Sequence, residues 1–393
     1  MVVKFDILFE HDSGVYFAGQ ELKGKVVIHL NKPKKVRGLE LRIKGFAAVK
    51  WSESGSDNNS TYYDGKEDYI KTTTHLVAAS DSTVLDPGTH TFNFTCQLSP
   101  LCPSSFEGKY GHIRYTARVV LVRPWKFDQK YTKGFTVLAL VDLNRIPTIR
   151  LPFHMNISRT FRCWPLSTGD LRVTLDMPQS GYVPGECLPL KLLIDNKSNV
   201  AVVSINTKLR MIIKFSSQHP SKKTNKDKIS IAKLYGEGVR SKTKKEFNYR
   251  INIPATPPTS FDRCGIINIM YELNVEIALS GWNLKETLSA PVVIGTVPFS
   301  SSRQQQPTTS RAVEQRKMET YFGDERQPEP LKIVRSDETP QDDSQTPWGE
   351  SPPPTYETAM HMMAGKINQE EQNDYGPLEF SPRYPVFNIP RNT

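Results

Sequence analysis

The stretch SPPPTYETAM, residues 351–360, contains three consecutive prolines that a single threonine separates from a tyrosine. Proline fixes its own φ near −65° and favours a polyproline II helix, which is stiff before it meets a partner. WW domains bind such helices in a groove lined with aromatic side chains. We therefore expect Pro353 and Pro354 to dock in a WW groove and Tyr356 to fill the adjoining pocket. The alternative is a chance match in a proline-rich segment.

A second proline–tyrosine stretch, SPRY at residues 381–384, lacks the first proline of that motif. A single short peptide makes a small interface, and its affinity for one WW domain is about micromolar. Retention on a partner then requires a second weak contact, or several WW domains in the partner. We therefore consider Pro382 and Tyr384 as an auxiliary WW contact, with an inert chain end as the alternative.

A run of positive charge lies between Lys208 and Arg250, where 13 Lys and Arg residues accompany three acidic ones. Clustered cations near an anionic bilayer contribute about 1 kcal/mol each, so the run could bind acidic lipid or an acidic cargo segment. The alternative is a solvated pair of strands with their loop. Nucleic acid is not expected as a partner, because the run lacks interleaved stacking aromatics. The candidate contacts are Lys222, Lys223, Lys226, Lys242, Lys244 and Lys245.

No group of residues has the spacing of a catalytic or metal site. The eight histidines are dispersed, and there is no Gly-x-Ser-x-Gly, His-Glu-x-x-His or phosphate-binding loop. The five cysteines are scattered, which indicates reduced structural thiols. Cys163 lies beside Arg162, yet a structural thiol remains the better interpretation. We expect no enzymatic activity, no metal and no cofactor.

Alternation of apolar and polar residues dominates residues 1–299 and predicts the elements that carry these motifs. In INIMYELNVEIAL, residues 267–279, every second side chain is apolar. Shorter stretches such as LELRIKG and HIRYTARVVL follow the same rule. Strands with one dry and one wet face give this pattern, and two sheets must bury their dry faces together. The sequence therefore predicts an all-β chain of immunoglobulin-like β-sandwiches.

An internal repeat divides this region into two. VYFAGQELKGKVVI, residues 15–28, aligns with residues 181–194, and residues 92–106 resemble residues 247–261. Repeats of this kind indicate two tandem sandwiches of similar plan. The predicted domains are an N-terminal sandwich, a linker, a C-terminal sandwich and a tail, with boundaries at residues 1–145, 146–164, 165–299 and 300–393.

The tail differs in composition from the rest of the chain. It holds 12 of the 29 prolines and few aliphatic residues, which predicts disorder. It contains 10 Lys and Arg against 15 Asp and Glu, so it carries −5 while residues 1–299 carry +15. No signal peptide or membrane span is expected from the sequence. The basic body suits anionic partners.

Several phrases together resemble the α-arrestins, the arrestin-domain-containing proteins. They include GLELRIKGFAAVKW, SPLCPSSFEGKYGHIRYTARVVLVRPWKFD, VDLN, SGYVPGECLPLKLLIDNKS and APVVIGTVPF. The resemblance covers residues 5–299, and the proline–tyrosine motif belongs to the same pattern. It implies two arrestin sandwiches and a tail that recruits WW-domain HECT-type ubiquitin ligases. Members often carry two Pro-Pro-x-Tyr motifs, whereas only the one at Pro353–Tyr356 is complete here.

The resemblance also implies a function. The expected chain is an adaptor that links membrane receptors or transporters to ubiquitination, endocytosis and endosomal sorting. Its expected location is cytoplasmic, peripherally at the plasma membrane and endosomes, with anionic inner-leaflet lipid as a further expected partner. The alternative is a structural trafficking scaffold of the retromer arrestin-like type, without ligase recruitment.

Overall fold

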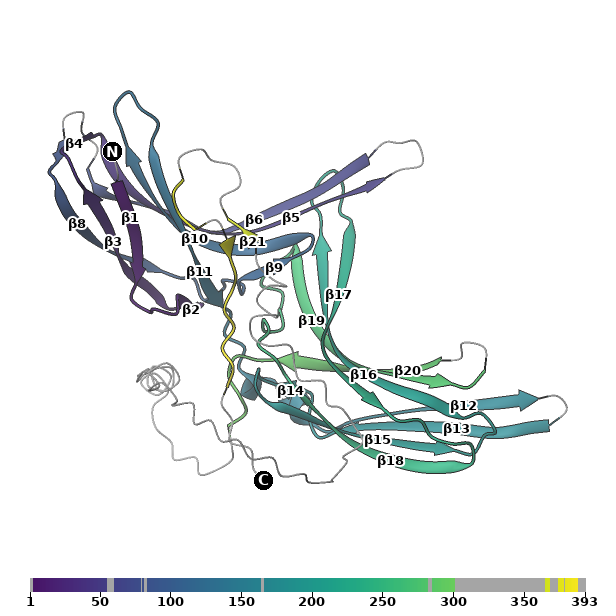
Figure 1. Ribbon diagram of the computed structural model, residues 1–393. Coiled ribbons are helices and arrows are strands. Elements are labelled where there is room, and N and C mark those ends of the chain that lie inside the picture. The colour runs from purple at the N-terminus through teal and green to yellow at the C-terminus, as the bar shows by residue number, and fades with distance from the viewer. Residues whose placement is uncertain are drawn as a thin grey trace, which may run out of the picture. The chain divides into compact units, whose positions relative to one another are not determined.

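The computed structural model describes residues 3–54, 60–78, 80, 83–163, 166–281, 285–300, 365–367, 374–377 and 379–387 (Figure 1). The described part is built almost wholly from strands. Its helical turns are two short 3-10 helices, η1 (Leu143–Arg145) and η2 (Pro147–Arg150). No helix in these residues is long and apolar enough to cross a membrane. The all-β prediction is confirmed.

The N-terminal sandwich packs two sheets and carries a small ribbon. One sheet has the order β1 (Val3–Phe9), β3 (Glu21–Leu30), β8 (Gly88–Gln97). The other has the order β2 (Val15–Phe17), β11 (Gln129–Leu138), β10 (Gly111–Val122), β5 (Gly38–Ser54), β6 (Ser60–Val77), with β9 (Phe106–Gly108) beside β10. The ribbon pairs β4 (Lys34–Val36) with β7 (Thr83–Leu85).

The C-terminal sandwich repeats this plan. One sheet has the order β12 (Phe153–Cys163), β13 (Leu166–Met177), β15 (Cys187–Asn196), β18 (Thr243–Asn252). The other has the order β14 (Gly181–Tyr182), β20 (Lys285–Ile294), β19 (Ile267–Leu279), β16 (Val202–Ser216), β17 (Thr224–Gly236). In both copies a short strand runs parallel to the last strand of the sandwich, and the other pairs are antiparallel. The predicted tandem sandwiches are confirmed.

The repeat extends to single atoms. Ser104 Oγ accepts a hydrogen bond from the Ala139 amide at 2.8 Å, and Thr259 Oγ1 accepts one from the Ile294 amide at 2.9 Å. Both positions are shifted by the same 155 residues. These hydroxyls satisfy the amides of Ala139, directly after β11, and of Ile294, the last residue of β20. An unpaired buried donor at either place would cost about 1–3 kcal/mol. The two copies therefore close their sheets in the same way.

Alternation in the sequence becomes burial in the structure. Along β19 the side chains of Ile267, Ile269, Leu273 and Ile277 are buried, while Asn268 and Glu276 on the other face keep partial contact with water. Fully burying such an aliphatic side chain stabilises the fold by about 1.5–3 kcal/mol. The dry face of β19 therefore contributes to the core of the C-terminal sandwich.

The predicted linker at residues 146–164 is too long, because its second half is strand β12. Met155 pairs with Leu175 and Ile157 with Val173 in the antiparallel register with β13. The alternation of FHMNISRTF supplies the half-buried face that this edge strand needs. The connection between the sandwiches is therefore the pair of 3-10 helices with their flanking residues.

Part of the predicted tail also has a fixed place. The short strands β21 (Gly365–Lys366) and β22 (Glu379–Phe380) pair antiparallel, and residues 381–387 continue as extended chain (Figure 1). This segment lies along β11 and β10 of the N-terminal sandwich. It is an ordered stretch within a tail that the sequence predicted to be disordered.

Candidate functional site

The Pro-Pro-x-Tyr motif at Pro353, Pro354 and Tyr356 lies outside the described residues. Its assignment as a WW-binding motif therefore stays a prediction from sequence. The nearest described residue is Gly365, which lies nine positions beyond Tyr356 and begins the segment that contacts the N-terminal sandwich. We call residues 374–387 the docked segment.

Asp374 anchors the start of the docked segment. One carboxylate oxygen accepts a hydrogen bond from the Thr132 amide at 3.0 Å, and the other accepts from the Thr132 hydroxyl. Arg118 Nε lies 3.8 Å from the second oxygen, and the Asp374 side chain is almost fully buried. A buried carboxylate is tolerated when charge and hydrogen bonds compensate its desolvation, and all three partners do so here. Asp374 therefore fixes the register of the segment on β11.

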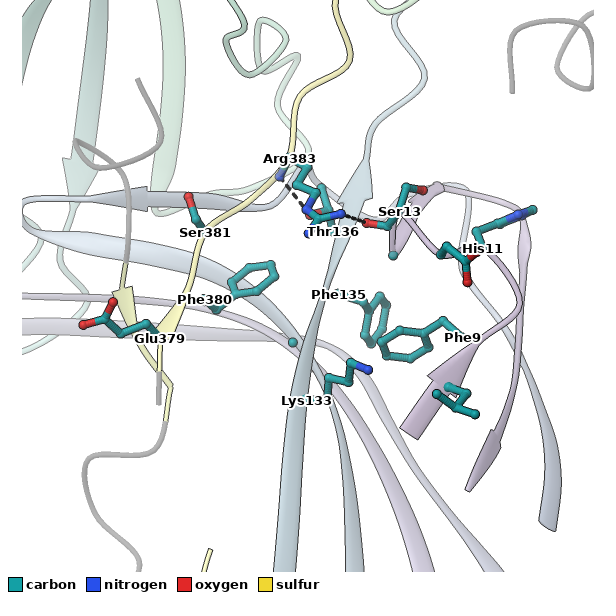
Figure 2. Close-up of a pocket in the computed structure, with 14 residues that line it drawn as sticks. Phe9, His11, Ser13, Lys133, Phe135, Thr136, Glu379, Phe380, Ser381 and Arg383 are labelled. Carbon is teal, nitrogen blue, oxygen red and sulfur yellow. Dashed lines mark hydrogen bonds between the residues drawn. The ribbon is translucent and has the colours of Figure 1, made fainter. Parts of the chain in front are cut away.

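Phe380, in the middle of the docked segment, covers Gly134 of strand β11. A Cβ atom at Gly134 would lie 2.5 Å from Phe380 Cδ2, so the ring occupies the space that a side chain on β11 would need. Beside it is a pocket of about 310 Å³ lined by Phe9, Phe135, Lys133 and Arg383 (Figure 2). Arg383 ties the segment to the sandwich on the other side of this pocket. Its amide donates to Thr136 Oγ1 at 3.0 Å, and its Nη1 donates to the Ser13 carbonyl at 3.1 Å.

Tyr384 is a further buried anchor of the segment. Only 7% of its surface is exposed, and its hydroxyl donates to the Ser105 carbonyl at 3.0 Å. Burial raises the pKa of this phenol well above its ordinary value, so the hydroxyl stays protonated and keeps donating. Pro382 is buried as well. In this conformation neither side chain of the proposed auxiliary WW contact is presented to a partner.

The six lysines of the basic run do not form one patch. Lys222, Lys223 and Lys226 lie at the start of β17, whereas Lys242, Lys244 and Lys245 follow its far end and begin β18. The 13 residues of β17 span about 40 Å at 3.3 Å per residue. The structure thus separates the run into two groups of three.

Two of these lysines are engaged by acidic residues. Lys223 forms an ion pair with Glu53 at the end of strand β5 and lies 5.0 Å from the ring centre of Tyr63. Lys245 forms an ion pair with Glu237. At the same junction the Asp64 amide donates to the His219 carbonyl at 3.0 Å, so the β5–β6 hairpin of one sandwich contacts the β16–β17 turn of the other. Lys223 therefore has a role in joining the sandwiches, which its place in a charge run did not reveal.

The described residues give little support for metal binding or for a reactive cysteine. They contain no cluster of three or more His, Cys, Asp or Glu residues that could hold a metal ion. Burial raises the pKa of the thiols of Cys96, Cys102 and Cys264, which favours their unreactive protonated form. These three cysteines are buried, whereas Cys187 is exposed.

The docked segment itself was missed by sequence reasoning. It is proline-rich, and its anchors Asp374, Phe380 and Tyr384 have no periodic spacing. The one signal that could have found it is the density of aromatic residues, since four of its 14 residues are Tyr or Phe.

Comparison with known proteins gives consistent results for both sandwiches. Residues 5–144 match the family model described as "Arrestin (or S-antigen), N-terminal domain", and residues 167–299 match "Arrestin (or S-antigen), C-terminal domain". The chain is 30% identical over 315 residues to arrestin domain-containing protein 17 of Caenorhabditis elegans, covering 75% of this chain and 71% of that protein. It is 30% and 29% identical to arrestin domain-containing protein 4 of Mus musculus and Homo sapiens, covering 76% of this chain in both cases and 73% and 72% of those proteins.

Proposed function

Because the chain belongs to the α-arrestin family, we propose that it is an adaptor which brings WW-domain HECT-type ubiquitin ligases to membrane cargo. In this proposal the cargo is a receptor or transporter, and the outcome is ubiquitination, endocytosis and endosomal sorting. The chain supplies binding surfaces, and the ligase supplies the catalytic groups. The adaptor works by raising the local concentration of ligase near the lysines of the cargo.

The observation that carries the proposal is the Pro-Pro-x-Tyr motif behind two arrestin sandwiches. The polyproline II conformation is favoured before binding, so docking of Pro353 and Pro354 costs little conformational entropy. Tyr356 supplies the aromatic ring for the adjoining pocket. A phosphate on Tyr356 would add about −1.5 to −2 charge in that pocket, and we expect it to weaken docking.

The docked segment supports a tail with two proposed roles: one part attaches to the sandwiches, and the Pro-Pro-x-Tyr motif binds the ligase. It contacts the N-terminal sandwich from Asp374 to Tyr384, and the Phe387 amide donates to the Pro184 carbonyl of the C-terminal sandwich at 2.9 Å. Tyr356 lies 18 residues before the first anchor, Asp374. A tail joined to the body at this point keeps the motif within a short tether of the sandwiches. Cargo held by the sandwiches and ligase held by the motif would then be close together.

The remaining partners and the location are part of the same proposal. We assign the chain to the cytoplasm, peripherally at the plasma membrane and endosomes, with anionic inner-leaflet lipid as a partner. The two lysine groups of the basic run are proposed contacts for acidic cargo or lipid. Lys223 and Lys245 are paired with acidic residues, and Lys242 Nζ donates to the Lys197 carbonyl at 2.7 Å. The better candidates within those groups are therefore Lys222, Lys226 and Lys244.

The test is capture of ligases from cells that express the full chain. Pro354→Ala with Tyr356→Ala should remove HECT-type ligases from the captured proteins and slow ubiquitination of cargo. Thr355→Ala is the matched control, because the motif allows any residue at that position. Capture of ligases by the double variant at the wild-type level would overturn the proposal.

A further inference from the structure

The turn between β10 and β11 exposes two large aromatic side chains. Trp125 is 95% exposed and Phe127 is 82% exposed, and both lie within the six residues Arg123–Asp128. We call these six residues the aromatic tip. Figure 1 shows it at the end of the N-terminal sandwich where β4 lies, in the loop that joins β10 to β11. Exposed apolar groups of this size mark interaction sites more often than chance surface.

The aromatic tip is held in shape by its own hydrogen bonds. Arg123 Nε donates to the Phe127 carbonyl at 2.8 Å, and the Arg123 amide donates to Asp128 Oδ1 at 3.3 Å. Trp125 adopts φ = 57°, a left-handed conformation that is costly for a bulky residue. The turn therefore holds Trp125 and Phe127 outward, although folding them back would remove apolar surface from water.

Cations surround the tip on the neighbouring strands. The Arg37 guanidinium lies 5.9 Å from the ring centre of Trp125, and the Arg37 amide donates to the Val122 carbonyl at 2.8 Å. Lys34 donates to Gln129 at the base of the turn. Burial, followed by the charges of Arg123 and Lys126, lowers the pKa of Lys34 to about 8.

Three further lysines are exposed in the same region. Lys32 precedes strand β4, Lys35 lies within it, and Lys126 lies between the two aromatic residues. None of the three forms an ion pair with a carboxylate in the part of the chain that the structure describes. Next to Lys35, its β7 partner Val84 adds a 53% exposed aliphatic side chain. The acidic group within the tip, Asp128, is half-buried and accepts the Arg123 amide.

We propose that the aromatic tip docks on an anionic membrane surface, with Trp125 and Phe127 inserted at the headgroup boundary and Lys32, Lys35, Arg37 and Lys126 facing lipid phosphates. Indole rings favour that boundary, and cations beside them add attraction to acidic lipid. The apolar side chains match the acyl layer of a bilayer, and the cations match its anionic headgroup layer. A convex turn offers little of the flat area that a stable protein interface needs, so a membrane is the better fit than a protein partner.

This inference names a surface for the lipid contact in the proposed function, and it is independent of ligase recruitment. The basic run of the C-terminal sandwich provides the rival surface. Its lysines are divided into two distant groups, and aromatic residues of comparable exposure do not flank those lysines in the described part of the chain.

The experiment is sedimentation of the purified full chain with phosphatidylcholine vesicles, with and without phosphatidylserine. Wild type should bind the anionic vesicles, and Trp125→Ala with Phe127→Ala should lower the partition coefficient at least about tenfold. Lys35→Glu with Lys126→Glu should lower it by at least about fivefold for each cation replaced. Leu101→Ala, at a 74% exposed apolar residue elsewhere in the N-terminal sandwich, should leave it unchanged.

Fluorescence gives a second readout that does not depend on folding losses. The emission of wild type should shift to the blue when anionic vesicles are added, and Trp125→Phe should bind yet lose that shift. The inference is overturned if wild type does not bind anionic vesicles or if the tip variants bind like wild type. It is also overturned if Lys226→Glu with Lys244→Glu abolishes binding while the tip is intact. Capture of WW-domain ligases should be the same for all these variants, which separates this test from that of the proposed function.

Discussion

The tail carries two stretches that combine proline with tyrosine: residues 381–384, which lie in the docked segment, and residues 351–356, which lie outside the described residues. Pro382 and Tyr384 are buried against the N-terminal sandwich, with the tyrosine hydroxyl donating to Ser105. Pro353, Pro354 and Tyr356 have the full spacing for a WW groove and none of the flanking anchors of the docked segment. The comparison teaches that the neighbours of residues 381–384 hold that stretch on the body. Around Tyr384 those neighbours are Asp374 and Arg383, which bind the sandwich on either side of Phe380.

The largest expected effect comes from removing the buried phenol. Tyr384→Ala deletes a large buried ring and its hydrogen bond, so we expect the docked segment to lose about 3–5 kcal/mol of docking free energy. Hydrogen exchange at the Arg383 and Phe387 amides measures this loss, since both donate to the body of the protein. Tyr384→Phe is the control and should cost only about 1 kcal/mol. Unchanged protection in Tyr384→Ala would mean that the comparison above is mistaken.

A smaller effect is expected at the start of the segment. Asp374→Asn removes the charge that Arg118 compensates and weakens the hydrogen bonds from Thr132, at a cost of about 1–3 kcal/mol. Protection of the Thr132 amide should fall in proportion. Tyr375→Ala is the neighbouring control, because that side chain is exposed and should change nothing. Equal effects at both positions would show that Asp374 is not the anchor.

The smallest effect is expected at Gly134. Alanine there would place Cβ 2.5 Å from the Phe380 ring, but this half-buried ring can turn aside, so the cost is about 1 kcal/mol. Hydrogen exchange of the docked segment again gives the measurement. Adding Phe380→Ala should make Gly134→Ala neutral, because the clash is then gone. If the losses of the two single variants add in full in the double variant, the strain does not come from contact between Cβ of residue 134 and the Phe380 ring.

The sequence predicted what depends on local pattern. Alternation at Ile267, Ile269 and Leu273 requires a strand with one dry face, and the buried side chains of β19 confirm it. The repeat at Gly19 and Gly185 predicted two copies of one plan, and both glycines have φ near +92°. Such features are visible because the cause lies within a few residues.

Features that depend on distant partners were not predicted. Asp374 meets Thr132 across 242 positions of sequence, and Lys223 meets Glu53 across 170. The segment RPWKFD alternates like a continuing strand, so the exposure of Trp125 and Phe127 at a turn could not be recognised. Strand β12 was assigned to the linker because two prolines in that region indicated irregular chain.

The most direct test of the central claim is a titration of the full chain with a pair of WW domains from a HECT-type ligase. We predict about micromolar binding for wild type, a loss of at least about hundredfold for Pro354→Ala with Tyr356→Ala, and a change within about threefold for Pro382→Ala with Tyr384→Ala. Binding that survives in the first double variant and disappears in the second would contradict the account.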